Sequence, residues 1–132
     1  MALSEPIIKN AVPHISNDVL NRIKAIKLTR WKGGQHPTFD TITRKMSDEG
    51  MRPYTWQNGP NFRAAARCNG YTKVIYCVDG SLELILPDIN QSVLLRPGDR
   101  IELPSGVRHA TIVGPNGARC LESALPDVRR ES

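Results

Sequence analysis

Residues 98–109 constrain the fold of this 132-residue chain more than any other stretch. The stretch begins with a turn, because Pro97 fixes φ and Gly98 accepts a positive φ, and residues 104–106 make a second turn. Between the turns, residues 100–103 alternate polar and apolar, as a strand with one buried face does. His109 then begins another strand, 110–113, from which its ring can point into the space that the sheet encloses. Turns and strands this closely spaced predict an all-β fold.

From residue 54 onward, short strand-like segments alternate with turn signals rich in Gly, Pro, Asn and Asp. The segments are 54–56, 62–67, 73–78, 81–86, 92–95, 100–103, 110–113 and 118–122. Strands interrupted this often are typical of a sandwich or barrel. Asp79-Gly80 lies between two apolar runs and predicts a β-hairpin closed by a type I′ turn.

The N-terminal part has a different pattern. Ser16 is a candidate N-cap, and the helical spacing of the apolar residues after it predicts a helix that ends at Gly33-Gly34. A second short helix is expected after Pro37, with a strand over 38–46 as the alternative because three Thr residues there favour β structure. We therefore divide the chain into an N-terminal arm and helical extension (1–52), a β-barrel (53–125) and a polar tail (126–132).

Charge and composition narrow the function classes. The net charge is +5, and residues 1–32 hold six basic against two acidic residues. We interpret this as a solvated helix face, with an anionic small molecule or an acidic partner surface as alternatives. Nucleic acid is not expected, since aromatic residues make up 5% of the chain and do not interleave with the basic ones. No apolar run reaches the roughly 18 residues of a membrane span. The N-terminus also lacks the pattern of a signal peptide, and a cytoplasmic protein with free thiols is expected.

The region from Tyr54 to Glu122 resembles the short single-domain cupins. The resemblance rests on residues 56–59, 73–80 and 113–117, and on the spacing of residues 98–109, which matches the second cupin motif. It implies a double-stranded β-helix, a jelly-roll barrel, here with an N-terminal α-helical extension. It also implies a homodimer paired through sheet edges, which need covering in any case.

The first cupin motif normally supplies most of a metal site, with the pattern Gly, five residues, His-x-His, three or four residues, Glu, six residues, Gly. When the motif is anchored on Gly80, its Glu position falls on Lys73. Its two His positions fall on Arg67 and Asn69 with a three-residue gap, or on Ala66 and Cys68 with a four-residue gap. The motif is therefore degenerate.

A metal does not suit these replacements, because Arg and Lys offer no lone pair and repel a cation. We expect no cofactor and a polar, net-positive pocket for a polar or anionic small molecule. Its expected lining residues are Arg67, Asn69, Lys73, Ile75, Cys77 and His109. One alternative is a metal-dependent dioxygenase or isomerase that binds a divalent transition metal through His109, with Cys68 as second ligand. The other is a non-catalytic interaction protein with a filled barrel.

The individual residues also have simpler interpretations. Arg67 could reach solvent or pair with Glu83 or Glu102, Lys73 is more often a solvated strand-edge residue, and His109 could be hydrogen-bonded in a core. Cys77 could meet His109 as a nucleophile and base, although a small apolar residue in a core strand is the favoured interpretation. The sequence thus leans against an enzyme without deciding the question.

Overall fold

The computed structural model describes Ile7 and residues 15–126. The predicted N-terminal arm and polar tail fall largely on residues outside this part. Two helices, α1 (Asn17–Lys24) and α2 (Phe39–Asp48), precede most of the strands, and a 3₁₀ turn, η1 (Pro87–Ile89), lies among them. The strands are β1 (Lys27–Thr29), β2 (Tyr54–Asn58), β3 (Arg63–Arg67), β4 (Lys73–Leu86), β5 (Gln91–Leu95), β6 (Arg100–Leu103) and β7 (His109–Ala124).

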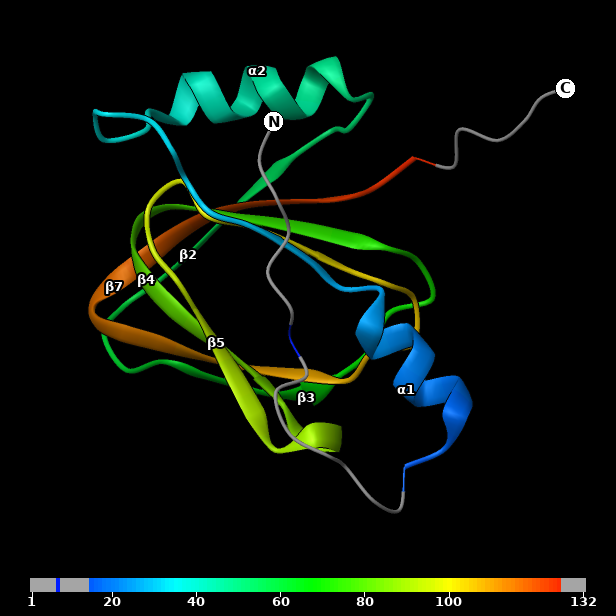
Figure 1. Cartoon of the computed structure of the whole chain (residues 1–132). Coiled ribbons are helices and arrows are strands. Elements are labelled where there is room, and N and C mark those ends of the chain that lie inside the picture. Colours follow the sequence, from blue (N-terminus) through cyan, green and yellow to red (C-terminus); the bar gives the residue numbers. More distant parts are fainter. Residues whose placement is uncertain (1–6, 8–14, 127–132) are drawn as a thin grey trace, which may run out of the picture.

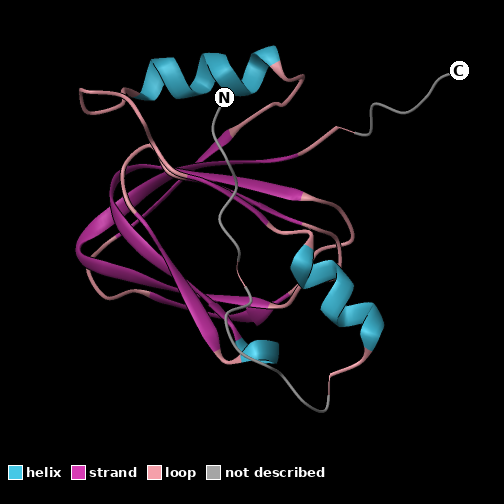
Figure 2. Cartoon of the chain, viewed as in Figure 1, coloured by secondary structure: helices cyan, strands magenta, loops and turns pink. Residues whose placement is uncertain are grey.

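Two long strands, β4 and β7, form the centre of the barrel and pair antiparallel along most of their length. Where residues 73–80 of β4 pair with residues 118–124 of β7, the strand order is β1-β6-β4-β7-β2. Where residues 82–85 of β4 pair with residues 110–113 of β7, β5 pairs with the other edge of β4 and β3 pairs with the other edge of β7. The two regions curve into the two walls of a jelly roll, with the helices outside it (Figures 1 and 2). The predicted all-β jelly-roll barrel with an N-terminal helical extension is confirmed.

The predicted hairpin at Asp79-Gly80 is wrong, because the chain bends there without reversing. Gly80 has φ +74°, and the register against β7 shifts on both sides of it. Its backbone lies so close to Gly117 that an added Cβ would overlap the Gly117 carbonyl oxygen. Pairing with a distant strand therefore overrides the local turn signal, and the bend carries β4 from one wall of the barrel to the other.

The first helix ends earlier than the sequence predicted, at Lys24. From there the burial pattern changes to a period of two, with Ile26 and Leu28 buried and Lys27 exposed between them. The segment then forms β1, which pairs with β6 and extends the sheet. Helix α2 replaces the alternative strand, since the Thr38 hydroxyl caps its first turn by accepting the Thr41 N–H at 3.1 Å.

Alternation along β4 separates two apolar clusters. Ile75 and Cys77 face the barrel interior, whereas Val74, Tyr76 and Val78 face outward. The outward residues pack against the buried Ile42 and Met46 of α2. This explains why residues 73–78 are buried without a break, since both faces of the strand are covered.

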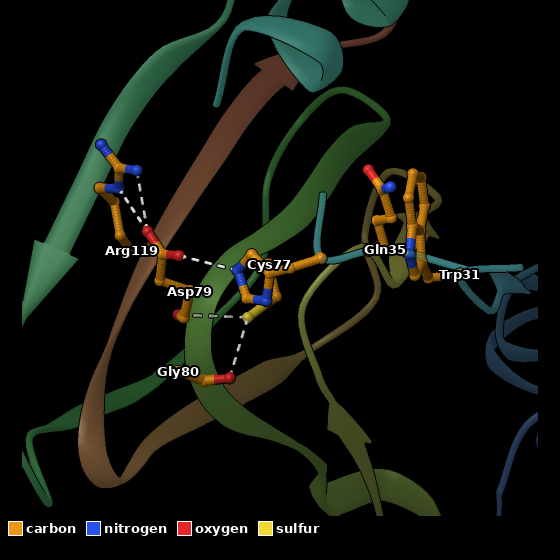
Figure 3. A network of polar contacts seen from close by, with 7 residues as sticks. Trp31, Gln35, Cys77, Asp79, Gly80 and Arg119 are labelled. Carbon is orange, nitrogen blue, oxygen red and sulfur yellow. Dashed lines mark hydrogen bonds and ion pairs between the residues drawn. The ribbon is translucent and has the colours of Figure 1, made fainter. Parts of the chain in front are cut away.

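Two buried or partly buried carboxylates hold the N-terminal extension on the barrel. Asp99 accepts the Trp31 N–H at 2.9 Å and pairs with the Arg30 guanidinium at 2.8 Å. Asp79 accepts from Arg119 at 2.9 Å (Figure 3). His36 lies 3.0 Å from the other carboxylate oxygen of Asp79. These contacts fix the loop between β1 and α2 against the turn before β6, through Asp99, and against β4, through Asp79. Neither helix in the described part of the chain is long and apolar enough to cross a membrane.

Candidate functional site

A small cavity opens between β2, β3, β4 and β7, with a volume of about 20 Å³. It has room for a water-sized molecule. Its lining residues are Trp56, Ala64, Ala65, Arg67, Lys73, Ile75, Leu82, His109, Thr111 and Glu122. Polar and charged groups therefore meet apolar walls at one end of the barrel interior.

The structure brings four of the six residues expected from the sequence to this cavity: Arg67, Lys73, Ile75 and His109. Asn69 is not among them, because β3 ends at Arg67 and Asn69 lies in the following loop, where its carbonyl accepts the Gly106 N–H. Cys77 is buried at 0% exposure, but it does not line the cavity either.

Cys77 lies farther along β4, opposite Cys120. Its thiol lies 3.5 Å from the Asp79 carbonyl oxygen, to which it donates (Figure 3). The hypothesis of a Cys77–His109 nucleophile and base pair is therefore not supported by the arrangement. Contact with Cys77 and burial both raise the pKa of the Cys120 thiol, so Cys120 stays in the thiol form.

A buried ion pair dominates the cavity. The Lys73 ammonium lies 3.0 Å from Glu122 Oε1, and the two side chains are 4% and 8% exposed. The Tyr54 hydroxyl donates to the same oxygen at 2.9 Å, which leaves Oε2 with no hydrogen-bond partner among residues 15–126. Burial, together with the neighbouring Glu122 carboxylate, raises the pKa of Tyr54 to about 12, so this hydroxyl keeps its proton.

His109 lines the cavity as a neutral imidazole with one unprotonated ring nitrogen. Its Nδ1 lies 3.1 Å from the Val107 carbonyl oxygen, which can only accept, so Nδ1 carries the proton and donates. Nε2 is then the unprotonated nitrogen. Burial, with the positive charges of Lys73 and Arg67, lowers the pKa of His109, although the Val107 carbonyl acts in the opposite direction.

Arg67 lies directly beside His109. The two residues are register partners between β3 and β7, so their side chains emerge on one face of the pair. Arg67 is exposed and makes no ion pair with a described residue. The suggested partners are engaged elsewhere: Glu83 accepts from Ser92, and Glu102 pairs with Arg100. Arg67 thus forms the mouth of the cavity.

Sequence reasoning missed Tyr54, Trp56 and Glu122. Glu122 is the register partner of Ile75, which puts it diagonal to Lys73 on the same face of the β4–β7 pair. One signal was available, since a lysine that faces a barrel interior needs a carboxylate on a neighbouring strand. Identifying that carboxylate requires the pairing of strands that lie far apart in the sequence.

Solved structures share this barrel. An RmlC-like cupin from Shewanella frigidimarina matches with a TM-score of 0.50 at 15% identity, covering 79% of this chain and 78% of that one. The fold is that of a small cupin. A DUF861 family protein from Thermotoga maritima, also with a TM-score of 0.50, is 16% identical and covers 75% of this chain and 98% of its own. The TDP-quinovose 3,4-ketoisomerase of Campylobacter jejuni has a TM-score of 0.50 and 18% identity, covering 59% of this chain and 64% of that enzyme.

At these identities the likeness concerns the fold alone. No family model matches the sequence, and no curated protein matches it.

The residues on the cavity do not fit the metal site that the cupin resemblance implies. Of the lining side chains, His109 and Glu122 carry metal-type donor atoms, and one carboxylate oxygen is already bound by Lys73 and Tyr54. Cys68 is exposed and does not line the cavity. Within the described residues, no three His, Cys, Asp or Glu side chains gather closely enough to hold a metal ion. The ammonium of Lys73 would also repel a divalent cation beside it.

Proposed function

We propose that the barrel binds a small hydroxylated carboxylate without a metal, with the buried Lys73 ammonium in the place of a metal cation and Arg67 as the source of the net positive charge. The observation that carries this proposal is the Lys73–Glu122 ion pair inside the cavity, at 3.0 Å. Glu122 balances Lys73, and His109 is neutral, so Arg67 leaves the cavity with a net positive charge. An anion is the complement of such a site.

The hydrogen-bonding groups support the choice of ligand class. The Arg67 guanidinium is suited to bidentate capture of a carboxylate. His109 Nε2 and Glu122 Oε2 are acceptors without a hydrogen-bond partner in the described chain, and a ligand hydroxyl could donate to either. The apolar walls of Trp56, Ile75 and Leu82 suit a short carbon chain.

Ligand entry requires Arg67 to move. The present volume of about 20 Å³ holds a water and is too small for a hydroxy acid. Arg67 is the last residue of the exposed edge strand β3 and has no ion pair with a described residue to break, so it can swing outward. The proposal thus includes an opening of the cavity at β3, while the barrel formed by β4 and β7 stays fixed.

Trp56 lines the cavity and reports on its occupancy. In a Trp31→Phe variant, which leaves Trp56 as the one tryptophan, titration with lactate should change the emission, and uncharged propane-1,2-diol should not. Arg67→Ala should weaken lactate binding about tenfold or more, because a charge-assisted hydrogen bond is lost, and His109→Ala should weaken it about fivefold, because a hydrogen bond between neutral groups is lost. Arg63→Ala, on the same strand but outside the cavity, is the matched control.

Unchanged affinity in both Arg67→Ala and His109→Ala would contradict the proposal. If no small carboxylate binds at millimolar concentration, the small volume favours the second candidate, a filled barrel whose role is interaction. No reaction is proposed, and the metal-dependent enzyme alternative lacks the donor atoms it needs among the described residues of this cavity.

A homodimer remains part of the proposal. Each of the strands β2 and β3 pairs with β7 and with no other described strand, so each has an open edge. Tyr54 and Phe62 beside these edges are 51% and 42% exposed. A second copy would cover both the polar edges and the aromatic rings. Sedimentation equilibrium should give twice the chain mass, and a monomer at micromolar concentration would contradict this expectation.

A further inference from the structure

A second hollow lies outside the barrel, where the segment after β1 faces α2 and the outer side of β4. We name it the basic groove and define it by its lining residues: Thr29, Arg30, Trp31, Lys32, Gly33, Lys45, Tyr76, Gly98 and Arg100. Its volume is about 430 Å³, which lies within the range of small-molecule sites and far exceeds that of the barrel cavity. We propose that the basic groove binds a small organic phosphate.

The charges of the groove select an anion. Four of its lining residues are basic and none is acidic. Arg30 pairs with Asp99, and Arg100 pairs with Glu49 at 3.1 Å, so these two are already compensated. Lys32 and Lys45 form no ion pair with a described residue and reach the groove from different segments. Two uncompensated lysines match the double negative charge of a phosphate monoester.

The wall formed by Trp31 is fixed before any ligand arrives. Its backbone N–H donates to Asp99 at 2.9 Å, and its indole N–H donates to the Gln35 carbonyl at 2.9 Å. Gly33 and Gly98 leave the space that the indole occupies, since an added Cβ at either position would overlap the Trp31 side chain. A preformed wall lowers the entropy cost of binding.

The opposite side of the groove is equally defined. The Lys45 ammonium on α2 lies 5.7 Å from the centre of the Trp31 ring, and the Arg100 guanidinium lies 5.7 Å from the centre of the Tyr76 ring. Tyr76 is itself buried. A phosphate between Lys32 and Lys45 would therefore meet two cations, with aromatic surface beside it for the remainder of the ligand. This arrangement is more specific than the solvated helix face inferred from the sequence.

The chain offers a built-in reporter, because Trp31 lines the groove and Trp56 lines the barrel cavity. In a Trp56→Phe variant, ribose 5-phosphate should change the emission of Trp31 and should bind at least tenfold more tightly than ribose. Lys32→Gln and Lys45→Gln should each weaken binding about fivefold or more, and the double variant should abolish it. Lys24→Gln removes an equal charge from α1, outside the groove, and is the matched control.

If Lys24→Gln weakened the binding of ribose 5-phosphate as much as Lys32→Gln or Lys45→Gln does, the effect would come from the net charge of the protein. That result would overturn the proposal. It would also be overturned if ribose 5-phosphate did not bind at millimolar concentration, or if an oligoglutamate peptide bound in its place. The Trp31→Phe variant separates the two sites, since Trp56 should not respond to ligand in the groove. If ribose 5-phosphate does not bind to the basic groove, the proposed lactate site in the barrel is unaffected. If lactate does not bind in the barrel, the proposal for the basic groove is unaffected.

Discussion

Removal of one partner from the Lys73–Glu122 pair should destabilise the fold strongly. The Nζ–Oε1 distance of 3.0 Å corresponds to about 5.5 kcal/mol of attraction at an effective dielectric constant of about 20. With both side chains less than one-tenth exposed, neither charge regains full hydration when the other is removed. We expect Lys73→Met or Glu122→Gln to lower the free energy of unfolding by about 3–5 kcal/mol.

The double variant distinguishes an ion pair from two separate packing effects. Lys73→Met combined with Glu122→Gln leaves no unpaired charge, and the amide introduced by Glu122→Gln would keep an oxygen that accepts from Tyr54. The cost of the double variant should fall short of the sum of the single costs by about 2–3 kcal/mol. Urea unfolding followed by circular dichroism at pH 7.5 measures all four corners of the cycle.

The exposed pair Arg22–Asp18 is the matched control. It has a similar distance of 3.0 Å, but its side chains are 47% and 74% exposed. Asp18→Asn should therefore change the unfolding midpoint little, and the change should shrink in high salt. Additive single costs at Lys73 and Glu122, or a cost of less than about 1 kcal/mol for either, would refute the reasoning.

Three further perturbations test other parts of the structure. For His109, whose pKa is lowered in the folded chain, acidification below the unfolded value of about 6.5 protonates only the unfolded chain. The free energy of unfolding should therefore decrease as the pH is lowered, by up to about 1.4 kcal/mol per pH unit. This pH dependence should be weaker in His109→Gln. Gly80→Ala should cost about 2 kcal/mol or more, since φ is +74° and the Cβ meets backbone, whereas Gly59→Ala in open space should cost less than about 0.5 kcal/mol in urea unfolding. Asp99→Ala should cost about 2 kcal/mol and speed hydrogen exchange in β1, and unchanged exchange there would contradict its role as an anchor.

Local sequence patterns predicted the structure correctly in segments whose conformation depends on their own residues. Strand β6 spans the predicted residues, because the turns at Gly98 and Gly106 bound it and alternation sets its buried face. Local patterns failed where distant strands intervene. Asp79-Gly80 carries a hairpin signal, yet the pairing of β4 with β7 on both sides holds the chain in one bent strand.

The residues of the candidate site also fall into two groups, those whose place follows from local sequence and those whose place depends on the pairing of distant strands. The sequence placed Lys73 beside the pocket only on the condition that it keeps the direction of the Glu position in the first cupin motif, and it placed His109 there from its position at the start of a strand. Glu122 could not be identified, because only the register of β4 against β7 puts it beside Lys73. Asn69 was expected in the pocket because a His position of the first cupin motif falls on it, whereas the structure places it in the loop after β3.

The central claim is that Lys73 replaces a metal in the barrel, and metal analysis tests it most directly. Purified protein is incubated with excess zinc or manganese at pH 7.5, desalted, and measured by inductively coupled plasma mass spectrometry. The wild type should retain far less than one metal per chain. Lys73→Glu, which adds a carboxylate beside Glu122 and His109, should retain more. Wild-type protein that holds one metal per chain, and loses it in His109→Ala, would contradict the account.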